Sequence, residues 1–309
     1  MPQGIYLPEG WLLQTHQNQR YIFNTEGLEK AWKEGTVLEG IATLCDEERN
    51  LHVRFGKEKG IIPHNEAGLG AEKGILRDIA ILSRVGKPVC FRIIGKEQER
   101  WTLSRRSVQE EAFQWFQNHL MPGEIIHATV THIEQFGAFV DIGCGLVSMI
   151  GIENISISRI RHVSERFCAG QQIRAVVLHK EPQGRIILSH RELLGTWQQN
   201  ASRLQVGSAV QGIVRSVENY GVFVEIFPNL SGLAEPCEGI ATGMDVSVYI
   251  KSIISDRMKV KLTILDHIAG DGKRLITSED YVLQEGRLRR WQYQPLQCSR
   301  HCIETYFES

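Results

Sequence analysis

No stretch of this 309-residue sequence holds eighteen consecutive apolar residues, the length that a transmembrane helix needs. The opening residues, MPQGIYLPEGWLLQ, also lack the basic and then apolar order of a secretory signal. The seven cysteines are scattered without a C-x-x-C pair, and their odd number disfavours a disulfide framework. We therefore expect a cytoplasmic protein from a reducing compartment, with no membrane contact.

An excess of charge of one sign is also missing. The 35 Lys and Arg residues nearly balance the 36 Asp and Glu residues, which gives a net charge of −1 and a pI of about 6.8. A strongly basic chain would point to nucleic acid directly. This chain can bind nucleic acid only through local basic patches or through stacking, so composition alone slightly disfavours such a role.

Motifs for catalysis or for tightly held ligands are absent as well. The sequence has no H-E-x-x-H, no Ser/His/Asp order that stands out and no paired-carboxylate motif. The segment GDGKR at 270–274 fails as a phosphate-binding loop, because His267 stands where the first glycine of that motif belongs. Cys298 and Cys302 are four residues apart, but zinc needs four ligands and no suitable second pair exists, which favours helix packing over metal. We expect neither an enzyme nor a cofactor.

The sequence does contain two copies of one unit. GEIIHATVTHIEQFGAFVDI begins at Gly123 and GSAVQGIVRSVENYGVFVEI begins at Gly207, and the offset of 84 residues holds without a gap. Each copy continues with a short segment, a valine-rich strand and a last alternating strand. A third, more divergent copy, GTVLEGIATLCDEERNLHVRFG, begins upstream at Gly35. About five short strands in roughly 60–70 residues predict a small closed barrel of the OB-fold type.

Each of the two clear copies places an aromatic ring on the face opposite the core. Val140 and Ile142 alternate with Phe139 and Asp141, so Phe139 is expected to share the solvent face with a carboxylate. The same alternation recurs 84 residues later around Phe223. One exposed ring is ordinary, but two at the same repeat position indicate a function.

We therefore expect an all-β protein of three tandem five-stranded OB-fold barrels joined by short helical connectors. The apolar residues at 108, 112, 116 and 120 predict one connector helix, and Thr196 is a candidate cap for another. The end of the tail, LQCSRHCIETYFE, is helix-like. The expected divisions are an amino-terminal extension with a short helix (1–33), a degenerate first barrel (34–106), a helical connector (107–121), a second barrel (122–193), a second helical connector (194–206), a third barrel (207–265) and a tail (266–309).

At this point the residues resemble a known family. The segments PGEIIHATVTHIEQFGAFVDIG and AGQQIRAVVLHKEPQGRIILSHRE resemble the RNA-binding domain named after ribosomal protein S1. The pattern of that domain contains F-G-A-F-V, a G-L-[IV]-H-I-S segment and a closing G-R-I-x-L-S. The resemblance is strong over 122–193, clear over 207–265 and weak over 34–106, and it implies barrels that bind RNA.

The family pattern implies an RNA surface made of two aromatics, a histidine, an acidic residue and an arginine. In the second barrel the resemblance gives these roles to Phe136, Phe139, Glu181 and Arg185, while Gly151 stands at the histidine position. Every base has a π-face that can stack on such rings, and basic side chains beside them neutralise phosphates.

The third barrel keeps Tyr220 and Phe223, with Lys259 in place of the arginine and Glu235 at the histidine position. The first barrel has no aromatic pair, so the resemblance implies no stacking surface there. Its contact positions hold Arg49, His52 and Pro63. The further basic candidates for phosphate contacts are Arg159, Arg161, Arg174, Arg215, Lys251, Arg257 and Lys261.

The expected function is capture of single-stranded RNA, with messenger RNA as the expected partner, on the second and third barrels. The resemblance implies support of translation at the small ribosomal subunit, onto which the first barrel would dock. Two alternatives stay open: a ribosome-independent RNA regulator or decay accessory, and a scaffold that binds proteins or glycans.

Overall fold

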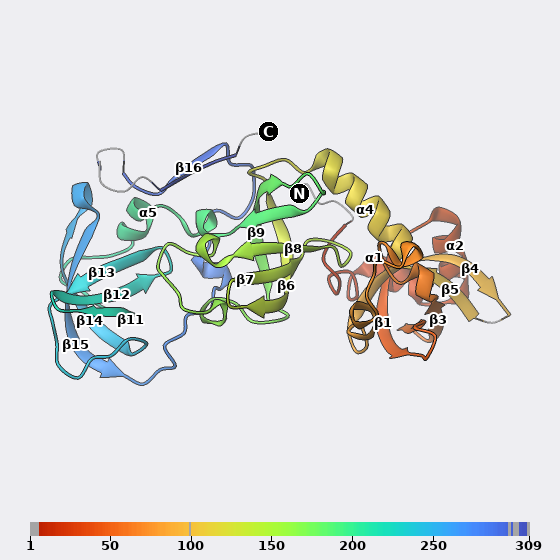
Figure 1. Cartoon of the computed structure of the whole chain (residues 1–309), viewed down its shortest axis with the longest axis horizontal. Helices are drawn as coiled ribbons and strands as arrows, with labels where there is room; N and C mark the ends of the chain where they lie inside the picture. The colour runs from red at the N-terminus through yellow and green to blue at the C-terminus, as the bar shows by residue number, and fades with distance from the viewer. Residues whose placement is uncertain (1–5, 99, 296–297, 299–302, 308–309) are drawn as a thin grey trace. The chain divides into compact units, whose positions relative to one another are not determined.

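The computed structural model of the chain describes residues 6–98, 100–295, 298 and 303–307 (Figure 1). Two compact units divide the chain. The first contains residues up to 120 with 127–129 and 141–147, and the second contains 121–126, 130–140 and the chain from 148 onward. Strands outnumber helices over the described chain as a whole, which gives a mainly β protein, although the first unit carries as much helix as strand and is not the all-β barrel expected from the sequence.

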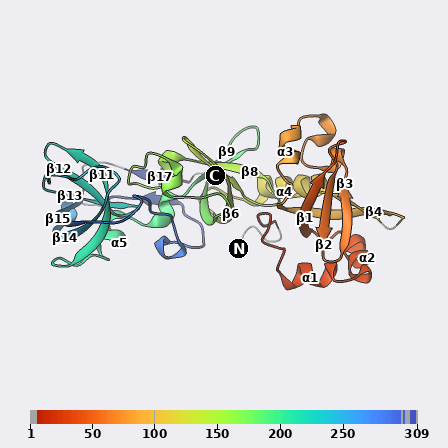
Figure 2. The same ribbon diagram turned by 90° about the horizontal axis from the view of Figure 1, so that it is seen from below.

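Five strands of the first unit close into a barrel in the order β1-β2-β3-β5-β4. Figure 2 shows β1, β2 and β3 side by side in it. Its core follows the alternation of the sequence, because Leu51, Val53 and Phe55 are buried while Arg54 is exposed. The strands are β1 (Leu38–Cys45), β2 (Leu51–Phe55), β3 (Glu58–Ile62), β4 (Pro88–Glu97) and β5 (Arg100–Ser104).

Helices surround this barrel. A short helix was expected near the amino terminus, and the structure has one there that is capped: Asn24 accepts a hydrogen bond from the Gly27 backbone N–H at 2.8 Å, and Gly35 ends the helix with a φ of 62°. The helix expected from the apolar spacing at 108, 112 and 116 is also present, with those residues buried. The helices of this unit are α1 (His16–Ile22), α2 (Thr25–Glu34), α3 (Asp78–Leu82) and α4 (Arg106–His119), with 3-10 turns η1 (His64–Glu66) and η2 (Ala71–Lys73).

Two further sets of five strands close into barrels in the orders β10-β8-β7-β6-β9 and β11-β12-β13-β15-β14. In each, the third strand pairs parallel with the fifth, as β3 does with β5. The middle set comprises β6 (Ile125–Glu134), β7 (Gly137–Asp141), β8 (Val147–Gly151), β9 (Gln172–Lys180) and β10 (Ile186–Ser189). The last set comprises β11 (Ala209–Glu218), β12 (Gly221–Phe227), β13 (Leu230–Ala234), β14 (Asp245–Ile254) and β15 (Lys259–Ile268).

Short helical turns connect these strands. Thr196 caps the five-residue helix α5 (Trp197–Ala201), as its position at the start of TWQQNASRLQ indicated. The 3-10 turns are η3 (Ile152–Asn154), η4 (Val163–Glu165), η5 (Arg191–Leu194), η6 (Ser255–Arg257) and η7 (Ser278–Asp280). In the part of the chain that the structure describes, every helix is too short or too polar to span a lipid bilayer.

The carboxylates next to the two aromatic rings do not face solvent, which corrects the expectation from the sequence. Asp141 is 3% exposed, and it accepts hydrogen bonds from the backbone N–H groups of Glu9, Gly143 and Gly145. Burial raises the pKa of this carboxyl to about 7, and the nearby Glu9 carboxylate adds to the shift. Glu225 is 1% exposed. Alternation placed both acids on the outer side of their strands correctly, but that side is covered.

Glu225 is the centre of a buried ion network in the second unit. Its Oε2 accepts hydrogen bonds from Arg166 Nη2 at 2.5 Å and from Arg215 Nε at 2.7 Å. Arg215 also pairs with Glu165 of η4. Arg166 is wholly buried, and desolvation lowers its pKa. The network therefore joins the loop after β8 to strands β11 and β12.

Most of the helix-like segment expected at the end of the tail, 296–308, lies outside the described residues, and its described part is not helical. Residues 304–306 form strand β17 (Glu304–Tyr306), which pairs antiparallel with β16 (Arg290–Gln292). The preceding part of the tail, blue in Figure 1, is bonded along the second unit: the Ile276 N–H donates to Arg166 O and the Val282 N–H donates to Leu193 O. The segment from 271 to 283 is thus a strap on this unit, held by backbone hydrogen bonds.

A buried histidine fixes the strap. His190 is fully buried, with Nδ1 2.9 Å from Ile155 O and Nε2 3.1 Å from the Tyr281 hydroxyl. Burial lowers its pKa to about 4. The neutral ring can donate from Nδ1 and accept the tyrosine proton at Nε2, so the contact to the strap requires no charge.

Loss of the Glu225 charge should destabilise the second unit strongly. Glu225→Gln leaves two buried guanidinium groups without their shared carboxylate, and the usual cost of breaking a buried ion pair is about 3–5 kcal/mol. The free energy of unfolding, measured in urea, should fall by that order, whereas Glu218→Gln on the exposed end of β11 should change it by no more than about 0.5 kcal/mol. Equal stability of the two variants would contradict the network.

Stability should fall as the pH drops through the range of the histidine. His190 has a lower pKa in the folded chain than the unfolded value of 6.5, so the unfolded state binds the proton first. The stabilisation is complete above about pH 6.5 and is lost toward pH 4, with a limiting slope of about 1.4 kcal/mol per pH unit. In urea titrations at several pH values, His190→Gln should show a shallower slope than the wild type. The exposed-site variant His267→Gln should keep the wild-type slope, and three equal slopes would show that His190 does not contribute.

Candidate nucleic-acid interface

A pair of aromatic rings marks the start of strand β7. The Phe136 ring is 55% exposed and the Phe139 ring is half-buried. Their centroids are 6.0 Å apart at an interplanar angle of 88°, an edge-to-face contact of favourable geometry. On its other side, Phe139 stacks on the His132 ring at 6.2 Å and 27°. Phe136 is therefore the more accessible ring of the pair, whereas the strand alternation had pointed to Phe139 as the exposed one.

The same pair recurs at the start of β12. Tyr220 is 67% exposed, Phe223 is half-buried, and their centroids are 6.2 Å apart at 87°. The two pairs have nearly the same distance and angle although their strands belong to different barrels. The structure therefore brings together the rings that the sequence predicted to act together, once in each barrel.

The glycine within each aromatic motif makes this geometry possible. A Cβ atom at Gly137 would lie 2.6 Å from Ile150 O, and one at Gly221 would lie 2.5 Å from Ala234 O. Both distances are too short for any side chain, so the strand start can approach its neighbour only with glycine. This close approach places the preceding ring, Phe136 or Tyr220, at the edge of the barrel.

The acidic and basic residues expected beside the first pair lie in the turn between β9 and β10. The Glu181 N–H donates to Arg185 O at 2.8 Å, so the backbone closes the turn. The Arg185 side chain is exposed and Glu181 is half-buried. The turn leaves the guanidinium group accessible to a ligand.

Three lysines of the third barrel were candidates, and they differ in their surroundings. Phe223 pairs with Leu233 and Leu233 pairs with Lys261, so Lys261 lies two strands from the ring, about 10 Å across the sheet. Lys259 opens β15 and is exposed. Lys251 forms an exposed ion pair with Glu235 at 2.9 Å, and this pairing lowers the pKa of that carboxyl. Lys259 and Lys261 are the more available of the three.

Two arginines from the wider set of basic candidates have structural roles. Arg215 belongs to the buried network, with a side chain that is only 10% exposed. Arg174 Nη1 donates to Gln284 O of the tail at 2.5 Å. The sequence could not separate them from free surface cations, because their partners are distant in the chain. Arg159 and Arg161 remain exposed.

The first barrel differs at every one of these positions. Arg49 has a positive φ of 67° and pairs with Asp78 at 2.8 Å. His52 contacts Asp46 at 3.2 Å. The positions that hold aromatic rings in the other barrels are therefore occupied by side chains engaged in local polar contacts.

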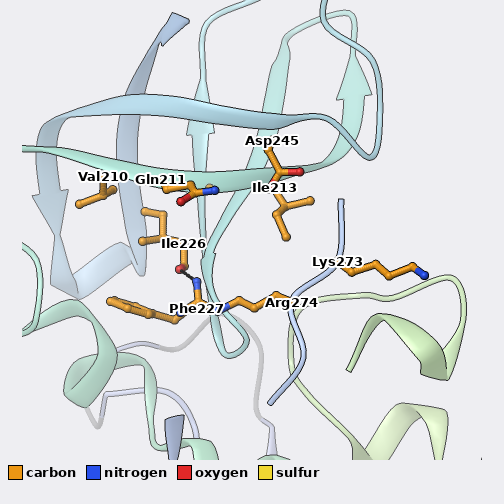
Figure 3. A pocket seen from close by; sticks show the side chains of 9 residues that line it. Val210, Gln211, Ile213, Ile226, Phe227, Asp245, Lys273 and Arg274 are labelled. Carbon is orange, nitrogen blue, oxygen red and sulfur yellow. Dashed lines mark hydrogen bonds between the residues drawn. The ribbon is translucent and has the colours of Figure 1, made fainter. Parts of the chain in front are cut away.

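A cavity of about 390 Å³ lies elsewhere on the third barrel, against the tail (Figure 3). Val210, Ile213 and Ile226 line it, and Arg274 closes one side by donating a hydrogen bond to Ile226 O. The Arg274 guanidinium also lies 5.4 Å from the Phe227 ring centroid. Arg274 thus contributes to attachment of the strap, and this cavity contains neither aromatic pair.

The cysteines considered for metal give no such site in the described residues. Cys298 is half-buried, and Cys302 lies outside the described part of the chain. Within 6–98, 100–295, 298 and 303–307, no group of three or more His, Cys, Asp or Glu side chains is placed to hold a metal ion.

Comparison with known proteins identifies the middle barrel. The family model for the S1 RNA binding domain matches residues 119–191. Small ribosomal subunit protein bS1 of Leuconostoc lactis is 30% identical over 188 residues, which cover 55% of this chain and 44% of that protein. The bS1 protein of Neisseria meningitidis serogroup B is 28% identical over 263 residues, 81% of this chain and 44% of that one.

A solved multidomain protein with nucleic acid binding domains from Streptococcus pneumoniae is 14% identical, with a TM-score of 0.26, over 75% of this chain and 74% of that chain. The chain spans about half the length of the curated relatives it matches. Residues 119–191 of the chain therefore match the S1 RNA binding domain, and the chain is similar to small ribosomal subunit protein bS1 over part of that protein's length.

Proposed function

We propose that this protein binds single-stranded RNA, with messenger RNA as its substrate, in support of translation. The observation that carries the proposal is the repeated edge-to-face pair, Phe136 with Phe139 and Tyr220 with Phe223, at the same position of two barrels. Unpaired bases stack on such rings whatever their sequence, whereas a duplex hides its base faces.

Phosphate contacts complete the proposed mechanism. Arg185, Lys259 and Lys261 are exposed on the barrels that carry the rings, and the first two stand where the S1 pattern has its arginine. Because the net charge of the chain is only −1, attraction over the whole surface is weak. The affinity would then come from stacking together with these few local cations.

The proposed organisation is three S1-type OB-fold barrels with different tasks. We propose the boundaries expected from the sequence, 34–106, 122–193 and 207–265, for the three barrels; the last strand of the third, β15, runs to Ile268. We assign RNA capture to the second and third barrels.

We propose that the first barrel docks onto the small ribosomal subunit. It has Arg49 and His52 in place of rings, and both are engaged with nearby carboxylates. Its segment 69–85 exposes several large apolar side chains, the kind of surface that marks protein–protein contacts. These side chains are Leu69, Ile75, Ile79, Leu82 and Val85. The bS1 relatives support the choice of the small subunit as partner.

The stacking model makes a direct prediction for the two exposed rings. Phe136→Ala and Tyr220→Ala should each weaken binding of a single-stranded oligoribonucleotide by about 1–3 kcal/mol, the usual loss for one base–aromatic stack. Their thermal stability should change little, because truncations at the surface usually cost no more than about 0.5 kcal/mol. Fluorescence anisotropy of the full chain measures the affinity. The salt concentration is kept at about 50 mM, because contacts to phosphates weaken steeply as salt rises.

The matched control is Phe23→Ala, which removes a ring that is 79% exposed in the first unit and should leave the affinity unchanged. The dependence of affinity on salt separates stacking from charge: Lys259→Ala should lower the salt slope by about one counterion, and the ring variants should not. Equal affinity for a single strand and its duplex, or no binding to either, would refute the proposed function.

A further inference from the structure

A cavity of about 480 Å³ opens beside the aromatic pair of the third barrel. Tyr220 and Phe223 form one wall, Trp197 and Tyr293 line it as well, and the segment from Ile157 to Arg159 closes it from the loop after β8. All of these residues belong to the second unit. The volume lies within the range of ordinary small-ligand sites.

The repeat shows how the surroundings of the two aromatic pairs differ. In β6, His132 stacks on Phe139 at 6.2 Å and thereby covers that ring. The residue 84 positions later is Ser216, which pairs with Phe223 across β11 and β12 and lines the cavity. A serine lacks the ring that fills the corresponding place beside Phe139, so Phe223 keeps an uncovered side.

The polar groups around the cavity suit a nucleotide. The hydroxyls of Ser158 and Ser231 are 3.0 Å apart on its lining and can bond the edge of a base. Arg159 is exposed on the lining and, among the described residues, makes no hydrogen bond or ion pair. Arg215, a largely buried lining residue, has one nitrogen, Nη2, without a partner within the described chain. Glu218 is the one carboxylate on the described lining, and it is exposed.

We propose that this cavity takes one unstacked nucleobase of a bound single-stranded RNA, an inference that rests on the proposed RNA-binding function. The base enters beside Phe223, its edge meets the serine hydroxyls, and Arg159 contacts the adjoining phosphate. Bases splayed out of a single strand are recognised in this manner, by an aromatic wall and by hydrogen bonds to the base edge. In the middle barrel His132 takes the place of Ser216, so a base there is expected to stack on the exposed Phe136 and not beside Phe139.

The test fills the cavity while keeping the rings. Ser216→His supplies the imidazole that the middle barrel has, and it should weaken binding of a twelve-nucleotide single-stranded oligouridylate by about tenfold, the loss of one base contact. Ser208→His, which adds the same ring outside the cavity lining, should bind like the wild type. If Ser216→His does not fold, Ser231→Leu fills the same cavity from β13 and takes its place.

A methyl resonance reports entry of the base directly. Met258 lines the cavity and Met244 does not. In the full chain labelled with ¹³C-methyl methionine, saturation with the oligonucleotide should shift the Met258 signal by the ring current of the base and leave Met244 in place. The Met258 shift should vanish in Ser216→His and persist in Ser208→His.

The outcomes separate this inference from the proposed function. If the wild type binds the oligonucleotide but Met258 does not move, or if Ser216→His binds equally well, the cavity takes no base while RNA binding stands. If the wild type binds no single-stranded RNA, both proposals are wrong. If a peptide library and not the oligonucleotide moves Met258, the cavity is a protein-docking site and the inference is overturned.

Discussion

The buried carboxylate of Glu225 is the point on which the second unit depends. Removing one carboxylate and two guanidinium groups from water is costly, and the cost is offset by their mutual attraction and hydrogen bonds. A single oxygen of Glu225, Oε2, accepts from Arg166 in the loop after β8 and from Arg215 on β11, while Glu225 Oε1 and Arg215 Nη2 have no partner in the described chain. Phe223 lies two residues before Glu225 on the same strand, so the ion network fixes the strand that carries the ring.

The alternation of side chains predicted the strands and their inward faces correctly. Leu51, Val53 and Phe55 are buried as expected, and so is Val140. The same rule failed for Asp141 and Glu225, because a period of two residues gives the side of the strand and not what covers it. For Glu225 the cover is Arg166, 59 residues away in the sequence, and no local pattern contains it.

The parts of the candidate site that repeat as a motif could be predicted from the sequence. The parts that depend on ion pairs and hydrogen bonds between residues far apart in the chain could not. Tyr220 and Phe136 follow from the offset of 84 residues. Arg215 looked like a phosphate contact because charge alone does not distinguish a free cation from one paired with Glu165. The tail was the least predictable segment: it has no period of its own, since its backbone hydrogen bonds go to Arg166, Leu193 and other residues of the unit.

The tail strap and the Glu225 network also set the conditions under which the two aromatic pairs can act. Two binding modules joined by a flexible linker gain avidity only as far as the linker allows both to engage, and each binding event must order the linker. Here strap and network hold the two pairs within one compact unit before any ligand arrives. An RNA strand bound at one aromatic pair would therefore meet the second aromatic pair at a high effective concentration, and two weak stacking surfaces would act together as one strong site.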